Sequence, residues 1–91
     1  MKIYGGTLPP FEGTEGGYYT PEKEAVRQAV NAWIRTSGRF DAVLDFDQAL
    51  RDPAHPARLL PSYDSGDHLH PGDLGHRAMA NSVPLSLFGE E

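Results

Sequence analysis

Two short β-prone segments lie on either side of a single amphipathic helix, and this order leaves few possible folds. The first segment spans residues 2–8, and the second spans residues 41–46 with a nearly continuous apolar centre. A strand that returns through a helix to a second strand forms a right-handed parallel crossover in nearly all known cases. Because parallel strands are normally buried on both faces, two of them need neighbours. The order predicts an α/β fold, namely part of a doubly wound, flavodoxin-like domain.

The helix between the two strands has recognisable start and stop signals. Thr20 suits the N-cap, Pro21 suits the first helical position, and Gly38 is a natural stop. Apolar residues then recur at positions i, i+3, i+4 and i+7, namely Val26, Ala29, Val30 and Trp33. This spacing predicts one buried helix face, and we expect Trp33 and Phe46 to pack in the core.

The second half of the chain is predicted to be mostly loop and helix. A helical turn is expected at residues 47–51, followed by a proline-rich loop over residues 52–65. Pro71 is expected to open a last helix that ends before Pro84, whereas residues 85–91 show no clear pattern. The inward residues of this helix are predicted to be Leu74, Ala78 and Met79. The element order is therefore β-α-β-α.

Size and charge exclude several classes of protein. The chain has 91 residues and no cysteine, so it forms at most one small domain without disulfides or cysteine-ligated metals. Lys and Arg number 8 against 13 Asp and Glu, and the basic residues are scattered, which argues against nucleic acid as a partner. The apolar runs are too short for a membrane span, and the first residues do not resemble a signal peptide. The sequence does not indicate a cellular compartment.

The residues that suit chemistry are concentrated after residue 63. Asp67 and His70 are three apart on a loop that enters a helix, so the carboxylate can reach one ring nitrogen and leave the other facing a cleft. The positive end of the helix opened by Pro71 favours a neutral imidazole, which is competent as a base near neutral pH. In a second interpretation, both residues simply cap the helix. The spacing alone leaves both interpretations open.

Residues 66–80, which begin Gly-Asp-His-Leu-His-Pro, resemble the last conserved block of the SGNH hydrolases, also called GDSL-type esterases and lipases. In that family the Asp and His of Asp-x-x-His-Pro complete a Ser-His-Asp triad, and the resemblance places them at Asp67 and His70. Three upstream segments resemble the family's late strand and loop, the next helix and the next strand: residues 3–11, 24–35 and 40–47. The resemblance implies that residues 1–91 form one incomplete domain, the C-terminal portion of this fold.

The nucleophile of the family is not among these residues. It lies in an early Gly-Asp-Ser block, and the oxyanion donors are that Ser, a Gly and an Asn from the second and third blocks; the resemblance here begins downstream of all three. Ser65, two positions before Asp67, is the candidate substitute nucleophile, with Ser62 and Thr7 as further hydroxyls. A water activated by His70 is the alternative. It would react slowly, since oxyanion donors are worth about 10²–10³ in rate.

The same segment also permits a metal-binding interpretation. Its nitrogen and oxygen ligands would come from His68, His70, Asp64, Asp67, Asp73 and His76. Because the resemblance already accounts for two of these residues, we expect no metal and no other cofactor.

Two functions follow as hypotheses. The resemblance implies a carboxylic ester hydrolase that transfers the acyl group of a short-chain ester to water, with His70 as general acid and base and Asp67 as its orienting residue. The other hypothesis is a catalytically inactive, truncated domain that acts only as a self-associating module. Burial in so small a chain, with 10 Gly and 8 Pro, hardly exceeds the entropy cost of folding. In the resembled fold, the strand that contains Ile3 and Tyr4 would also lack a neighbour on one side. We therefore expect a homo-oligomer, most simply a two-fold dimer with an interface above about 1,000 Å², formed by edge pairing or by exchange of a terminal segment.

Overall fold

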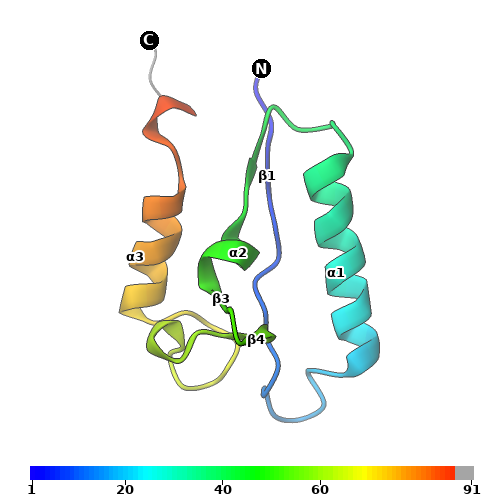
Figure 1. The fold of residues 1–91 in the computed structure, drawn as a ribbon, viewed down its shortest axis with the longest axis vertical. Helices are drawn as coiled ribbons and strands as arrows, with labels where there is room; N and C mark the ends of the chain where they lie inside the picture. Colours follow the sequence, from blue (N-terminus) through cyan, green and yellow to red (C-terminus); the bar gives the residue numbers. More distant parts are fainter. Residues whose placement is uncertain (88–91) are drawn as a thin grey trace.

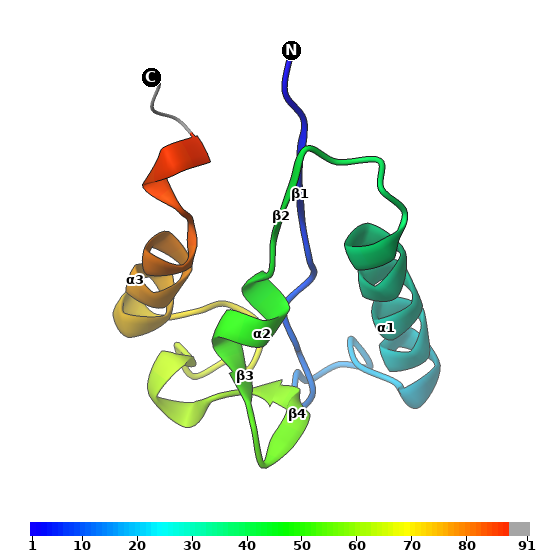
Figure 2. The same cartoon turned by 45° about the horizontal axis from the view of Figure 1, so that its top comes forward.

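A two-stranded parallel sheet lies at the centre of the computed structural model, which describes residues 1–87 (Figure 1). The elements follow in the order β1 (Tyr4–Gly6), α1 (Pro21–Thr36), β2 (Ala42–Leu44), α2 (Phe46–Leu50), β3 (Arg51–Asp52), β4 (His55–Leu59), η1 (Pro61–Tyr63), α3 (Asp73–Ser82) and η2 (Leu85–Leu87). β1 and β2 pair in parallel, with Gly5 opposite Val43, and they lie between α1 and α3 (Figures 1 and 2). The predicted α/β fold is confirmed, and it agrees with part of a doubly wound, flavodoxin-like domain.

The local signals at the ends of α1 are confirmed. The Oγ1 of Thr20 accepts a hydrogen bond from the backbone N–H of Lys23 at 3.1 Å, as an N-cap does. Pro21 occupies the first turn, and the helix ends at Thr36. Gly38 follows with φ of +73°, a left-handed conformation that favours glycine.

The predicted burial of the α1 stripe is wrong. Its residues face outward, namely Val26 (62% exposed), Ala29, Val30 (37%) and Trp33 (54%). The buried residues of α1 are instead Arg27, Asn31 and Ile34. Two of these, Arg27 and Asn31, are polar and bind the loop after β1, and Arg27 also binds α2. Within residues 1–87, no element covers the stripe. Trp33, expected in the core, contacts Phe40 edge to face with ring centroids 5.7 Å apart.

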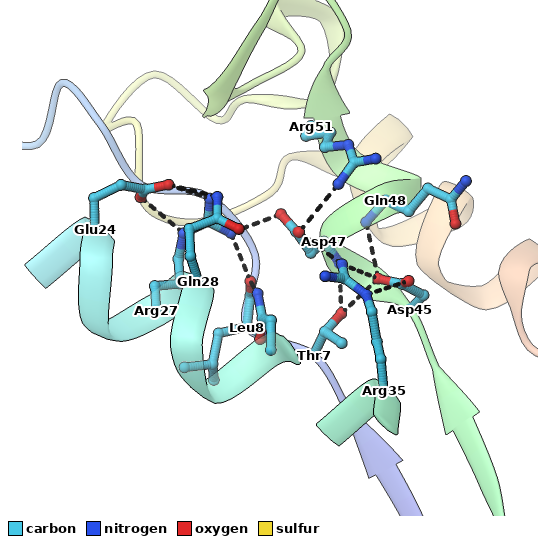
Figure 3. Close-up of polar contacts among 11 residues, drawn as sticks. Thr7, Leu8, Glu24, Arg27, Gln28, Arg35, Asp45, Asp47, Gln48 and Arg51 are labelled. Atoms are coloured by element: carbon cyan, nitrogen blue, oxygen red, sulfur yellow. Dashed lines mark hydrogen bonds and ion pairs between the residues drawn. The ribbon is translucent and has the colours of Figure 1, made fainter. Parts of the chain in front are cut away.

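The interior of the described residues is partly ionic. The buried aliphatic side chains are Ile34, Leu50 and Leu59. Asp47 is fully buried and accepts hydrogen bonds from Arg27 at 2.6 Å, Arg35 at 2.9 Å and Arg51 at 3.3 Å (Figure 3). A buried carboxylate is tolerated when it is paired and hydrogen-bonded in this way. Asp47 therefore joins α1 to α2, where the sequence predicted apolar packing.

The segment after α2 contains a hairpin that the sequence analysis predicted as loop. β3 and β4 pair antiparallel, with Arg51 opposite Leu59. The hairpin is also tied to the loop after β1, since the N–H of Glu12 donates to the C=O of Ala57 at 3.0 Å. Pro56 lies within β4, and prolines are confined to edge strands such as those of this two-stranded hairpin. β2 likewise ends earlier than predicted, because α2 begins at Phe46.

α3 begins at Asp73, two residues after the predicted Pro71, and ends before Pro84 as expected. Leu74, predicted to face inward, is half exposed, whereas Ala78 and Met79 are half-buried. The buried residue of the helix is Gly75 instead. A methyl group at this glycine would lie 2.6 Å from the carbonyl oxygen of Tyr63 and from Cβ of Pro71, so only glycine fits. Of the tail without a predicted pattern, residues 88–91 lie outside the described residues.

Candidate active site

The loop between η1 and α3 lies at the end of the sheet where β1 and β2 finish (Figures 1 and 2). Its two ends are joined by a bridge between Asp64 and Pro71 and by a hydrogen bond from the N–H of Ser65 to the C=O of His70 at 3.1 Å. In open α/β sheets, ligands bind outside the carboxyl ends of the strands. We call residues 64–71 the base loop.

Asp67 and His70 are in direct contact on the base loop. The Nδ1 of His70 lies 2.6 Å from Oδ2 of Asp67, while Oδ1 of Asp67 accepts from the backbone N–H groups of Leu69 and His70 at 2.9 and 2.8 Å. The hydrogen bond from the His70 ring, followed by these two amides, holds the pKa of Asp67 well below its usual range. The ionised carboxylate accepts from Nδ1–H and so fixes the His70 tautomer.

The second ring nitrogen of His70 is accessible. The side chain is 72% exposed, and within residues 1–87 its Nε2 makes no hydrogen bond. The interpretation of Asp67 and His70 as helix caps is wrong, because the N-cap of α3 is Gly72 and no side chain bonds to that end of the helix. The Asp67–His70 contact instead lies within the loop before α3, and it has the geometry in which a carboxylate orients an imidazole.

Two of the three hydroxyl groups predicted as substitute nucleophiles have other partners. Oγ of Ser65 donates to Oδ1 of Asp67 at 3.2 Å, so it contacts the orienting carboxylate rather than the imidazole. Oγ1 of Thr7 is buried, donates to Asp45 at 2.9 Å and accepts the N–H of Asp47. Ser62 is exposed in η1. Among the described residues, no hydroxyl is hydrogen-bonded to the His70 ring.

The base loop contains a second Asp-His pair that the sequence analysis considered only as metal ligands. The Nδ1 of His68 lies 2.6 Å from Oδ2 of Asp64, whose side chain is only 10% exposed. Burial opposes ionisation of Asp64, but the amides of Gly66 and His68 and the His68 ring together lower its pKa. Each histidine of the loop binds its own carboxylate. Among the described residues, no group of three or more such side chains is placed to hold a metal ion. The sequence signal for this pair is an Asp-x-x-x-His spacing around a glycine.

An apolar pocket of about 450 Å³ lies beside the base loop. Its apolar lining is formed by Leu8, Pro9, Phe11, Tyr18, Val26 and Leu69. Leu69 is the residue between the two histidines of the base loop and directly precedes His70. The backbone that carries His70 therefore adjoins the pocket at Leu69.

The walls of this pocket are held by polar contacts. The C=O of Leu8 accepts from Arg27 at 3.0 Å (Figure 3). It also accepts from Asn31 at 2.9 Å, and the N–H of Leu8 donates to Asn31 at 2.7 Å. The Nζ of Lys23 donates to the carbonyls of Gly17 and Tyr18 at 3.2 and 3.1 Å. The buried Arg27–Asp47 ion pair therefore also fixes the pocket wall at Leu8.

Comparison with known proteins agrees with the resemblance. The model of the GDSL-like lipase/acylhydrolase family matches residues 1–78, which include Asp67 and His70. No curated protein matches the chain. In the described residues, no helix has both the length and the apolar character needed to cross a membrane. The family match covers most of the chain, and the chain therefore belongs to the GDSL-like lipase/acylhydrolase family, a family of hydrolases.

Proposed function

We propose that this chain supplies the base of a carboxylic ester hydrolase, with His70 as general base and acid and Asp67 as its orienting residue. The observation that carries the proposal is the 2.6 Å contact between Nδ1 of His70 and Asp67, which leaves Nε2 accessible. Nε2 takes the proton of the attacking hydroxyl or water and then returns it to the leaving alkoxide. The Asp67 carboxylate stabilises the imidazolium that forms between these two steps.

The proposed substrate is an ester with a short, apolar acyl chain. The pocket beside the base loop has a volume of about 450 Å³, within the usual range for small ligands, and its lining is mostly apolar. Because Leu69 lines the pocket and His70 follows it, an acyl chain in the pocket would bring its ester group towards the base. Short acyl chains fit this volume without further space.

The nucleophile has two candidate sources in the proposal. Ser65 would have to leave its 3.2 Å contact with Asp67 and turn towards Nε2 of His70. A water molecule at Nε2 needs no such movement, so the geometry favours activated water over Ser65. We also propose that residues 1–91 form the C-terminal portion of the family domain, because their segments resemble its late strands and last block and contain no Gly-Asp-Ser sequence.

The test is hydrolysis of p-nitrophenyl acetate by the purified chain. We expect His70→Ala to lower the rate by about 100-fold, the usual scale of general-base catalysis, and Asp67→Asn to lower it less. His76→Ala removes an exposed histidine of α3 outside the base loop and serves as the matched control. A His70→Ala variant as active as the parent and the control would contradict the proposal. Fluorophosphonate labelling of Ser65 would identify it as nucleophile, whereas activity without labelling would favour water.

A second function is favoured by the exposed stripe of α1. Val26, Val30 and Trp33 would be covered if two copies associated through this helix. In this alternative the chain is a catalytically inactive, self-associating module. Dimers without any His70-dependent hydrolysis would support it over the hydrolase.

A further inference from the structure

We propose that Asp64 and His68 are positioning residues, which hold the base loop in the conformation that lets Asp67 bind His70. The inference rests on the proposed role of His70 as the base. It adds two residues to the site, neither of which touches the reacting atoms.

Asp64 is the residue around which the first half of the base loop is organised. Its Oδ1 accepts from the N–H groups of Gly66 and His68 at 2.8 and 3.0 Å, and its Oδ2 contacts Nδ1 of His68 at 2.6 Å. Its backbone bridges to Pro71, which closes the loop. One buried carboxylate thus fixes both the start of the loop and the orientation of residue 68.

His68 has a backbone conformation that needs such support. Its φ is +63°, and among the described residues it is the only one other than glycine with a positive φ. This left-handed region is uncommon for residues with a side chain. The His68 ring is held by Asp64 on one side and lies close to Gly13, where an added Cβ would be 3.1 Å from the ring. These contacts fix the unusual backbone and tie the base loop to the loop after β1.

Residue 68 lies between Asp67 and the amides that Asp67 binds. Those amides belong to Leu69 and His70, at 2.9 and 2.8 Å from Oδ1 of Asp67. A change of φ at residue 68 rotates the following peptide groups relative to the Asp67 side chain. Loss of the Asp64–His68 contact would therefore open the Asp67–His70 contact without altering either residue of that pair.

Two features distinguish the Asp64–His68 pair from a second base. The Asp64 side chain is nine-tenths buried, and the His68 ring is close to the backbone of Gly13. His70 is more exposed, and the neighbouring Leu69 lines the apolar pocket. The pair at Asp64 lines a polar cavity of about 310 Å³ together with Glu12 and Arg58, while the pair at Asp67 faces solvent.

The experiment follows the Asp67–His70 contact by NMR in four variants: Asp64→Ala, Asp64→Asn, His68→Ala and His68→Gly. The readouts are the downfield resonance of the His70 Nδ1 proton and the pH titration of the Asp67 carboxyl carbon. We expect Asp64→Ala and His68→Ala to lose the resonance and to move the Asp67 titration up towards its ordinary range. Asp64→Asn should retain part of both signals, because its side-chain oxygen still accepts from the loop amides.

His68→Gly separates the backbone from the ring. Glycine adopts the positive φ freely but lacks the contacts with Asp64 and Gly13, so we expect a weakened resonance between that of the parent and that of His68→Ala. His76→Ala is the matched control and should leave both signals unchanged. If Asp64→Ala does not fold, Asp64→Asn and His68→Gly decide the outcome.

If His68→Ala and Asp64→Ala fold and give the same signals as the parent, the proposal is overturned. If neither alanine variant folds, parent-like signals in both Asp64→Asn and His68→Gly overturn it. Neither readout requires catalysis. If the variants lose the His70 resonance but the parent hydrolyses no ester, the positioning role stands and the role of His70 as a base fails. If the parent hydrolyses esters and the variants keep the resonance, the proposed function stands without the positioning role.

Discussion

Asp45 shows how much one carboxylate contributes to the fold. It receives a bidentate pair of hydrogen bonds from Arg35, at 2.8 and 2.9 Å, and a third from Thr7 at 2.9 Å (Figure 3). It also caps α2 by accepting from the N–H of Gln48 at 3.2 Å. The Arg35 contact is the main reason that the pKa of Asp45 is lowered from 3.8 to about 2. Asp45 thus joins the segment after β1 to α1 and to α2.

Asp45 should make the stability of the chain depend on acid. Folding lowers the pKa of the Asp45 carboxyl from 3.8 to about 2. The stabilisation that the ionised carboxylate gives to the fold is therefore fully present above pH 3.8 and is lost as the pH falls through about 2. The shift corresponds to about 2 kcal/mol. In urea titrations across this range, Asp45→Asn should give a free energy of unfolding that falls less steeply with acid than that of the parent, with the remaining slope due to other carboxylates. Asn keeps the cap on α2. Parallel curves for both proteins would show that the Asp45–Arg35 pair contributes nothing.

At the scale of the elements, the sequence predicts ends better than faces. Thr20, Pro21 and Gly38 set the ends of α1 through a local hydrogen bond and local backbone conformation, and these signals are readable without the fold. Which face of a helix is buried depends on the elements that pack against it. The sequence therefore wrongly predicts burial of the stripe that contains Val30. The sequence does not predict the hairpin β3–β4, because a proline such as Pro56 usually argues against a strand. It is tolerated in β4 because that strand pairs along only one edge.

The candidate site, too, is predicted from the sequence only in part. Asp67 and His70 are readable from a short spacing and a family resemblance, and their contact is found at 2.6 Å. Asp64 is not readable as an organising residue, because its role depends on a turn at Gly66 and on the positive φ of His68. A sequence pattern reports which side chains are near in the chain, and not which backbone conformation brings them together.

The contact of α3 with the base loop gives a prediction at this scale. Gly75→Ala adds a methyl group 2.6 Å from the backbone oxygen of Tyr63, so α3 must shift away from the loop. We expect a loss of about 1–3 kcal/mol in the free energy of unfolding, as for other overpacked sites. Helix propensity alone predicts the opposite sign, a gain of about 1 kcal/mol. Chemical denaturation measures the sign, and Ala80→Gly at an exposed position of α3 calibrates the propensity. A stabilised Gly75→Ala would show that α3 is not held against the loop.

At the scale of the molecule, the chain has a well-connected polar interior and an uncovered apolar surface. The exposed face of α1 combines the stripe with small residues that allow close helix packing: Ala25, Ala29 and Ala32. An antiparallel pair of such helices buries both stripes, and the small residues let the two helices approach closely. We therefore propose a second copy of this chain as the partner of α1.

The two-fold dimer should be visible by light scattering at low micromolar concentration. Val30→Glu places a charge at the centre of the stripe and should yield monomers, while Gln28→Glu, elsewhere on the exposed surface of α1, should leave the dimer intact. Trp33 is the only tryptophan, so its fluorescence should shift to longer wavelength when Val30→Glu separates the helices. A parent chain that is monomeric and still unfolds cooperatively would show that the polar network around Asp47 stabilises the fold without a partner.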